Sequence, residues 1–192
     1  MRRMEEADVW QQGDKHADWY EAALRRTQEA PIRKAERMKV IHPEDMPWEI
    51  CRQGKLKHVI SDEMPAPTRT MNAYFQEIPP GGHSGKHRHM SEEAFFVLEG
   101  SGYDLHWDTE CVLTDRYEWE VDAEPKRFDW QAGDLVVIPL NTIHQHFNAD
   151  PERPARILCI TNNLYKFLEM DEIEQLEGAS DWTEEGSEEE AV

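Results

Sequence analysis

The sequence predicts an all-β domain, an antiparallel sandwich or barrel, with an α-helix at each end. Many short segments of strand character lie between residues 48 and 161. Turn-forming Gly, Pro and Asp residues separate these segments at short intervals, which is typical of antiparallel all-β folds. Apolar residues at helical spacing occur only towards the two ends of the chain. We therefore expect one β-domain with helical flanks.

The N-terminal residues have a helical pattern. Asp14 can cap a helix that continues to about Gln28, with its apolar residues on one face. Pro31 is expected to end or kink this helix. A second helical piece over residues 31–40 has this proline in its first turn, where proline is tolerated. Residues 1–47 are therefore predicted to form a helical extension.

The central part of the chain, residues 48–163, is predicted to form the β-domain. Its segments are short and apolar, and in several of them apolar residues occupy every second position, as in a strand with one buried face. The expected strands cover residues 48–51, 55–60, 70–78, 94–100, 103–107, 117–121, 127–130, 135–139 and 156–161.

The C-terminal part divides into two segments. Apolar residues return to helical spacing between Leu164 and Leu176, so residues 164–177 are predicted to form a C-terminal helix. Residues 178–192 are rich in acidic side chains and poor in apolar ones. We expect this segment to be a disordered acidic tail.

The charge and the cysteine content exclude several classes of protein. The net charge is -19, and residues 169–192 supply eleven acidic side chains and no basic one, which leaves -8 on residues 1–168. A body of this sign repels phosphate backbones, so no nucleic-acid partner is expected. No apolar run suits a signal peptide or a membrane span, and the three cysteines form no CxxC pair. We expect a cytoplasmic protein without a membrane partner.

The segment 81-GGHSGKHRHMSEEAFFVLEG-100 is the first candidate for a functional site. In a strand, side chains two residues apart point the same way, so His87 and His89 can present their imidazoles to one point. Neutral imidazole is the commonest metal ligand in proteins, and Glu92 or Glu93 could add an anionic oxygen. Taken alone, the segment also fits a solvated polar turn.

Two fixed-spacing motifs around these residues resemble those of the cupin superfamily. The first combines two glycines, two histidines and a glutamate, here Gly81, His87, His89, Glu93 and Gly100. The second combines glycine, proline, a turn residue, histidine and asparagine, here Gly133, Pro139, Asn141, His144 and Asn148. Asn141 stands where many members have glycine, and asparagine also tolerates a left-handed turn conformation. The resemblance covers about residues 70–162.

This resemblance implies both a fold and a metal site. The fold is an antiparallel cupin β-barrel, a double-stranded β-helix or jelly roll. The metal ligands carried over by the resemblance are His87, His89, Glu93 and His144. Three imidazoles and one carboxylate suit Fe(II), Mn(II), Ni(II) or Co(II), do not exclude Zn(II), and leave up to two octahedral positions open. We expect Fe(II).

Two of these ligand assignments have alternatives. Glu92 is adjacent to Glu93, and some ring-cleaving cupins use only histidines. His146 shares the strand face of His144 and could replace it, although the motif spacing favours His144. If it is not a ligand, His146 either supports the site, by proton transfer or by contact with a ligand, or is an ordinary hydrogen-bonded core histidine. Arg88, between two ligands, is expected to face away from the metal.

Residues 72–81, NAYFQEIPPG, with the HRH and FFVLEG segments after them, also resemble gentisate-type ring-cleaving dioxygenases. This resemblance implies a non-haem Fe(II) dioxygenase acting on a small aromatic or enolisable, oxygen-rich substrate, with dioxygen as co-substrate. His146 and Gln76 are then the candidate catalytic residues, for proton handling or orientation. Arg69 or Arg127 could clamp a substrate carboxylate, or both are surface charges.

Two other functions fit the same residues. In the first, the metal polarises a carbonyl in a non-oxidative isomerase, decarboxylase or lyase. In the second, the domain binds or senses a small molecule without catalysis, against which the complete four-ligand set argues. Each function has a small molecule as its partner. The terminal helices and the exposed barrel edges favour a homodimer.

Overall fold

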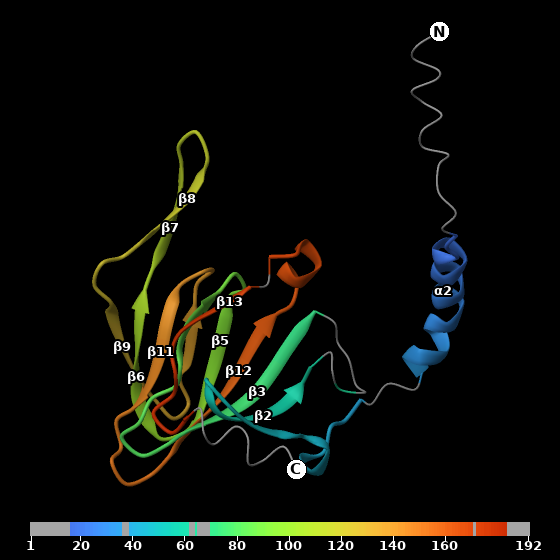
Figure 1. Cartoon of the computed structure of the whole chain (residues 1–192). Coiled ribbons are helices and arrows are strands. Elements are labelled where there is room, and N and C mark those ends of the chain that lie inside the picture. The colour runs from blue at the N-terminus through green and yellow to red at the C-terminus, as the bar shows by residue number, and fades with distance from the viewer. Residues whose placement is uncertain (1–15, 36–38, 62–63, 65–69, 171, 184–192) are drawn as a thin grey trace. The chain divides into compact units, whose positions relative to one another are not determined.

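A computed structural model of the chain describes residues 16–35, 39–61, 64, 70–170 and 172–183. The chain divides into two compact units, with the division between Arg37 and Met38. The first unit contains a helix, and the second contains all the strands of the described residues (Figure 1). Among these residues, no helix has both the length and the apolar composition needed to cross a bilayer.

The helix of the first unit is α2 (Trp19–Ala35). The predicted helix is therefore present, although its expected start at Asp14 lies outside the described residues. Pro31 was expected to end or kink this helix. The helix does not end there, because it continues to Ala35 and strong helix formers flank the proline. The predicted second piece does not reach residue 40, since residues 39–40 form a bend.

The second unit consists of antiparallel strands in two large sheets and a hairpin. One sheet has the order β1 (Trp48–Cys51), β2 (Gly54–Ile60), β3 (Met71–Ile78), β12 (Ala155–Asn162), β5 (Glu93–Glu99) and β10 (Leu135–Ile138). The other has the order β13 (Ile173–Glu177), β4 (Lys86–His89), β11 (Ile143–Asn148), β6 (Ser101–Trp107) and β9 (Lys126–Gln131). The hairpin is β7 (Thr109–Leu113) and β8 (Tyr117–Val121), and short 3-10 helices occur at η2 (Pro43–Asp45) and η3 (Tyr165–Leu168). The predicted antiparallel all-β architecture is confirmed.

Alternation along the strands decides which side chains enter the space between the two large sheets. On β5, Phe95 and Val97 are fully buried and Phe96 is exposed. The buried apolar cluster contains Ile78, Phe95, Val97, Trp130, Ile138, Ala155, Ile157 and Cys159. Glu93 shares the inward face of β5 with Phe95, so the same alternation turns a carboxylate into the barrel.

The prediction of a C-terminal helix over residues 164–177 is wrong. The structure has the 3-10 helix η3 and then the strand β13, in which Ile173 pairs with His89 of β4. Pairing with β13 gives the β4 backbone its hydrogen-bond partners on that side, and this tertiary contact overrides the local helical spacing.

The boundary predicted for the acidic tail is also wrong. The backbone N–H groups of Ala179 and Ser180 donate hydrogen bonds to the carbonyls of Arg52 and His83, and the guanidinium of Arg52 lies 4.6 Å from the centre of the Trp182 ring. Residues 178–183 are therefore anchored on the barrel. The rest of the predicted tail, residues 184–192, lies outside the described residues.

We predict that Gly102→Ala destabilises the barrel by about 3 kcal/mol, the upper range for an overpacked core site. Gly102 lies on β6 between β11 and β9, and an added Cβ would overlap the carbonyl oxygen of Phe147 and lie 2.5 Å from the Trp130 ring. Urea unfolding monitored by circular dichroism measures this loss of free energy.

Gly133→Ala is the matched control for this substitution. Gly133 has a φ of +95° but no heavy atom within 4 Å of an added Cβ, so only backbone strain of about 1 kcal/mol is expected. Equal destabilisation by the two alanines would contradict the packing described for Gly102.

Candidate metal centre

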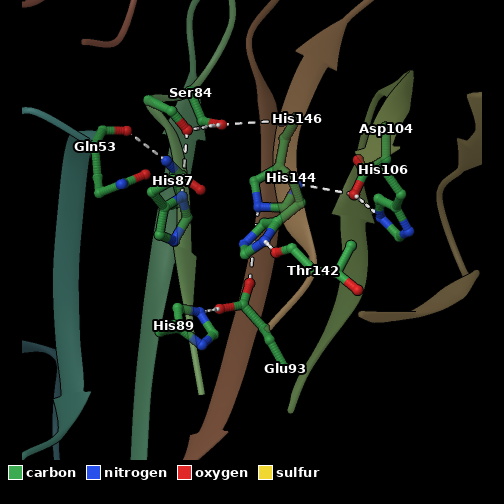
Figure 2. A network of polar contacts seen from close by, with 12 residues as sticks. Gln53, Ser84, His87, His89, Glu93, Asp104, His106, Thr142, His144 and His146 are labelled. Atoms are coloured by element: carbon green, nitrogen blue, oxygen red, sulfur yellow. Dashed lines mark hydrogen bonds and ion pairs between the residues drawn. The ribbon is translucent and has the colours of Figure 1, made fainter. Parts of the chain in front are cut away.

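Four side chains that the motifs single out converge inside the barrel (Figure 2). His87 and His89 lie on β4, Glu93 begins β5, and His144 lies on β11. One potential ligand atom from each lies within 4.8 Å of the others. This geometry could hold one metal ion, and the residues that form it come from both large sheets.

Strand pairing places the three imidazoles together. His144 is directly opposite His87 in the β11 and β4 pair, and their ring centres are 4.2 Å apart. His89 is two residues further along the same face of β4, with its ring centre 5.3 Å from each of the other two. The antiparallel register therefore produces the cluster without any unusual backbone geometry.

Backbone carbonyls orient the three rings. Carbonyl oxygens can only accept, so the ring nitrogen that contacts one carries the hydrogen and the other nitrogen keeps its lone pair. In each ring the Nδ1–H donates and Nε2 is left to bind a metal. The acceptors are the carbonyls of Thr142 (2.9 Å from His144), Ser91 (2.8 Å from His89) and Gly85 (3.4 Å from His87).

The Glu93 carboxylate fits the requirement for an anionic ligand. It is 2% exposed, and within the described part of the chain neither of its oxygens has a hydrogen-bond partner. The nearest cluster nitrogen is Nε2 of His89, at 3.5 Å from Oε2. Nε2 of His144 is likewise buried and unpartnered. Buried polar atoms without partners are costly, and a bound cation would satisfy these.

Burial and neighbouring side chains shift the pKa values of the four candidate ligands. Burial lowers the pKa of His87 to about 4 and that of His144 well below its usual value. Burial alone would raise the pKa of Glu93, but contacts with His146 and His89 hold it well below 4.5. In His89 burial is opposed by the contact with Glu93, and the net pKa is raised. The carboxylate is therefore ionised and the imidazoles of His87 and His144 are neutral, as metal binding requires, while a metal ion would displace the proton that the raised pKa of His89 favours.

The structure separates the candidates that the sequence left open. Glu92 is exposed, and its Oε2 accepts a hydrogen bond from Asn162, so only Glu93 points into the cluster. His144 is in the four-residue cluster, while His146 lies beyond Glu93, with Nε2 at 3.7 Å from Oε1. Arg88 faces out of the barrel towards Glu174, to which it donates a hydrogen bond.

Sequence analysis missed Asp104, which supports His146. Its Oδ2 is 3.0 Å from Nδ1 of His146 and 3.2 Å from Nε2 of His106, and its Oδ1 accepts a 2.8 Å hydrogen bond from Trp130 (Figure 2). These contacts oppose the effect of burial and lower the pKa of Asp104 to about 2. Alternation along residues 103–107 was a usable signal, but on β6 the polar side chains face inward and the apolar ones outward.

The structure gives the other proposed functional residues contacts outside the four-residue cluster. Gln76 is buried, and its Nε2 donates a 2.6 Å hydrogen bond to the carbonyl of Gln53. Arg127 is exposed and bound to Asp129, with its guanidinium 3.6 Å from the centre of the Tyr103 ring. These contacts give Arg127 the role of a surface charge, and Arg69 lies outside the described residues.

A cavity of about 410 Å³ opens onto the cluster. His87, His89 and Glu93 form part of its wall. Much of the remaining wall is apolar and comes from β2, β3 and β13, with Leu56, Ile60, Tyr74 and Ile173 among its residues. The volume suits a small organic molecule.

Comparisons with known proteins agree with this fold. A family profile described as a cupin domain matches residues 74–161. One similar structure is that of oxalate decarboxylase from Lactobacillus farciminis in complex with formate. Its sequence is 24% identical to this chain, and the two structures have a TM-score of 0.53. The match covers 70% of this chain and 35% of that one, so this chain spans about a third of the length of that relative.

Two further structures are similar over most of their own lengths. A cupin-like protein from Thermotoga maritima is 21% identical, with 68% of this chain and 79% of that chain covered and a TM-score of 0.46. A polyketide cyclase from Streptomyces resistomycificus is 22% identical, with 77% and 88% covered and a TM-score of 0.47. Residues 74–161 therefore match a cupin domain, and the similarity to the oxalate decarboxylase structure shows the same fold.

We predict that His87→Ala or His144→Ala abolishes the binding of iron, while His146→Ala retains it. Each of the first two substitutions removes a proposed ligand. His146 contacts Glu93 and Asp104 but is not one of the four clustered ligands, and loss of an outer partner of this kind weakens metal binding by about 10- to 100-fold. Iron per chain after anaerobic reconstitution and desalting is the measurement. Loss of iron in His146→Ala but not in His144→Ala would show that the two histidines are assigned the wrong way round.

Proposed function

We propose that this chain is a metal-dependent cupin enzyme that holds Fe(II) and oxygenates a small aromatic or enolisable, oxygen-rich substrate. One observation carries the proposal. Four ligand groups, His87, His89, Glu93 and His144, of which three are buried and His89 is partly buried, lie around one point at the wall of a largely apolar cavity. A purely structural cluster would have no need of an adjoining cavity of this volume.

The four ligand groups fit a metal ion with open coordination positions better than one whose positions are all filled by the protein. Three neutral imidazoles and one carboxylate occupy at most four of six octahedral positions, so two remain for substrate oxygens or dioxygen. A bound Fe(II) would supply Lewis acidity and electron transfer to dioxygen. A structural zinc site, by contrast, is usually closed by four protein ligands in tetrahedral geometry.

The chain's own residues would bind and shield the substrate. Leu56, Ile60 and Ile173 offer apolar contacts to a ring and exclude water from it. Tyr74 lines the same cavity, and burial raises the pKa of its hydroxyl well above 10, so that group stays protonated and can orient a substrate oxygen. His146 is not assigned a contact with the substrate, because it does not line the cavity and its Nε2 lies 3.7 Å from Oε1 of Glu93.

The test is oxygen uptake by the iron-loaded full chain with a panel of catechols, hydroquinones and gentisate-like acids. We expect uptake with at least one member, and its loss by a factor of about 100 or more in Glu93→Gln, as for removal of a group needed for the chemistry. Glu92→Gln is the matched control, since Glu92 is exposed and bound to Asn162.

Two results would contradict the proposal. Turnover of a substrate at equal rates with and without dioxygen would show a non-oxidative reaction, such as that of a decarboxylase, isomerase or lyase. Equal rates in Glu93→Gln and Glu92→Gln would show that the observed activity does not come from this centre.

A further inference from the structure

A second group of potential metal ligands lies on the far side of Glu93 from His89. Glu93, His146 and Cys159 each place one ligand atom within 4.8 Å of the other two. They come from β5, β11 and β12, and all three residues are at most 2% exposed. Neither cupin motif includes His146 or Cys159, so the proposed function leaves them without a role as ligands.

The imidazole of His146 is oriented as a metal-binding histidine is. Its Nδ1 lies 3.0 Å from Oδ2 of Asp104, and its Nε2 faces Glu93 and Cys159. Burial lowers the pKa of this imidazole, but Asp104 and Glu93 raise it to about 10, so a metal ion would have to displace the proton on Nε2. Asp104 is itself fixed by the indole N–H of Trp130 at 2.8 Å. A carboxylate behind an imidazole in this way is a common arrangement around protein-bound metals.

The facing atoms of Glu93 and His146 are unpartnered in the described structure. Oε1 of Glu93 and Nε2 of His146 are buried and 3.7 Å apart, which is longer than a hydrogen bond. Two ligands that each lie about 2.1 Å from one ion can be up to about 4.2 Å apart. The observed separation therefore suits shared coordination of a single ion.

We propose that His146, Cys159 and Glu93 form a second metal site, specific for a borderline ion such as Zn(II), with Glu93 bridging it to the first centre. The two carboxylate oxygens face different partners, since Oε2 lies towards His89 and Oε1 towards His146. A thiolate and an imidazole favour Zn(II) or Co(II). The first centre has imidazole and carboxylate ligands but no thiol, so it suits a harder ion. This site does not depend on the reaction proposed above.

Binding at this site requires the thiol of Cys159 to lose its proton. Burial and the nearby charge of Glu93 raise the pKa of this thiol well above 9, so the thiolate is not expected without a cation. Coordination would form a metal–sulfur bond and release the proton to solvent. No oxidant or reductant is involved. The ion displaces one proton from the Cys159 thiol and one from Nε2 of the His146 imidazolium, and both protons go to solvent.

The test is titration of the full-length, metal-free chain with Co(II) under nitrogen. We expect two ions per chain and a near-ultraviolet absorption from thiolate-to-cobalt charge transfer. Cys159→Ser should lose this absorption and one ion while keeping the other ion. Cys51→Ser and Cys111→Ser are matched controls, because both thiols are free and neither belongs to the cluster.

A failure of this proposal can be distinguished from a failure of the first centre. His144→Ala should lose one ion and keep the thiolate absorption, whereas His146→Gln should lose the absorption and keep one ion. His146→Gln also serves if Cys159→Ser does not fold, as judged by circular dichroism. One ion per chain without thiolate absorption in the unmodified chain would overturn the second site. So would an absorption that persists in Cys159→Ser.

Discussion

The site depends on the antiparallel register that places His144 of β11 directly opposite His87 of β4. Side chains on opposed positions of neighbouring strands lie within about 5.5 Å of each other, so this one pairing brings two imidazoles together. His89 follows by the period of two along β4. A shift of β11 by one residue would turn His144 away from the barrel interior and dismantle the cluster.

The barrel interior has an apolar part and a polar part. In both, every second side chain along a strand points inward. Phe95 and Val97 on β5 pack in the apolar cluster, while Glu93 on the same face carries a buried carboxylate. Burial of a carboxylate and several imidazoles is expensive unless they are paired with each other or with a cation. The fold therefore gives up stability at one end of the barrel to hold groups that can bind a metal, a common feature of functional sites.

Strand period alone predicted only that His87 and His89 share a face, and the other two residues of the cluster, Glu93 and His144, were expected from the resemblance to the cupin motifs. The sequence did not identify Asp104, because apolar residues at every second position of β6 suggested the wrong inward face. It also gave no reason to join Cys159 to Glu93, since β12 and β5 become neighbours only through sheet pairing. The strand β13 was missed for a similar reason, because its pairing with β4 is a tertiary contact that helical spacing conceals.

The proposed function requires that three histidines and one glutamate bind a single catalytic ion. X-ray absorption spectroscopy at the iron edge, on the full chain loaded with one equivalent of Fe(II), reports the atoms bound to that ion. We expect nitrogen and oxygen neighbours only, with the scattering pattern of three imidazoles. Absence of retained iron, or a spectrum with fewer than three imidazoles or with sulfur bound to iron, would contradict it.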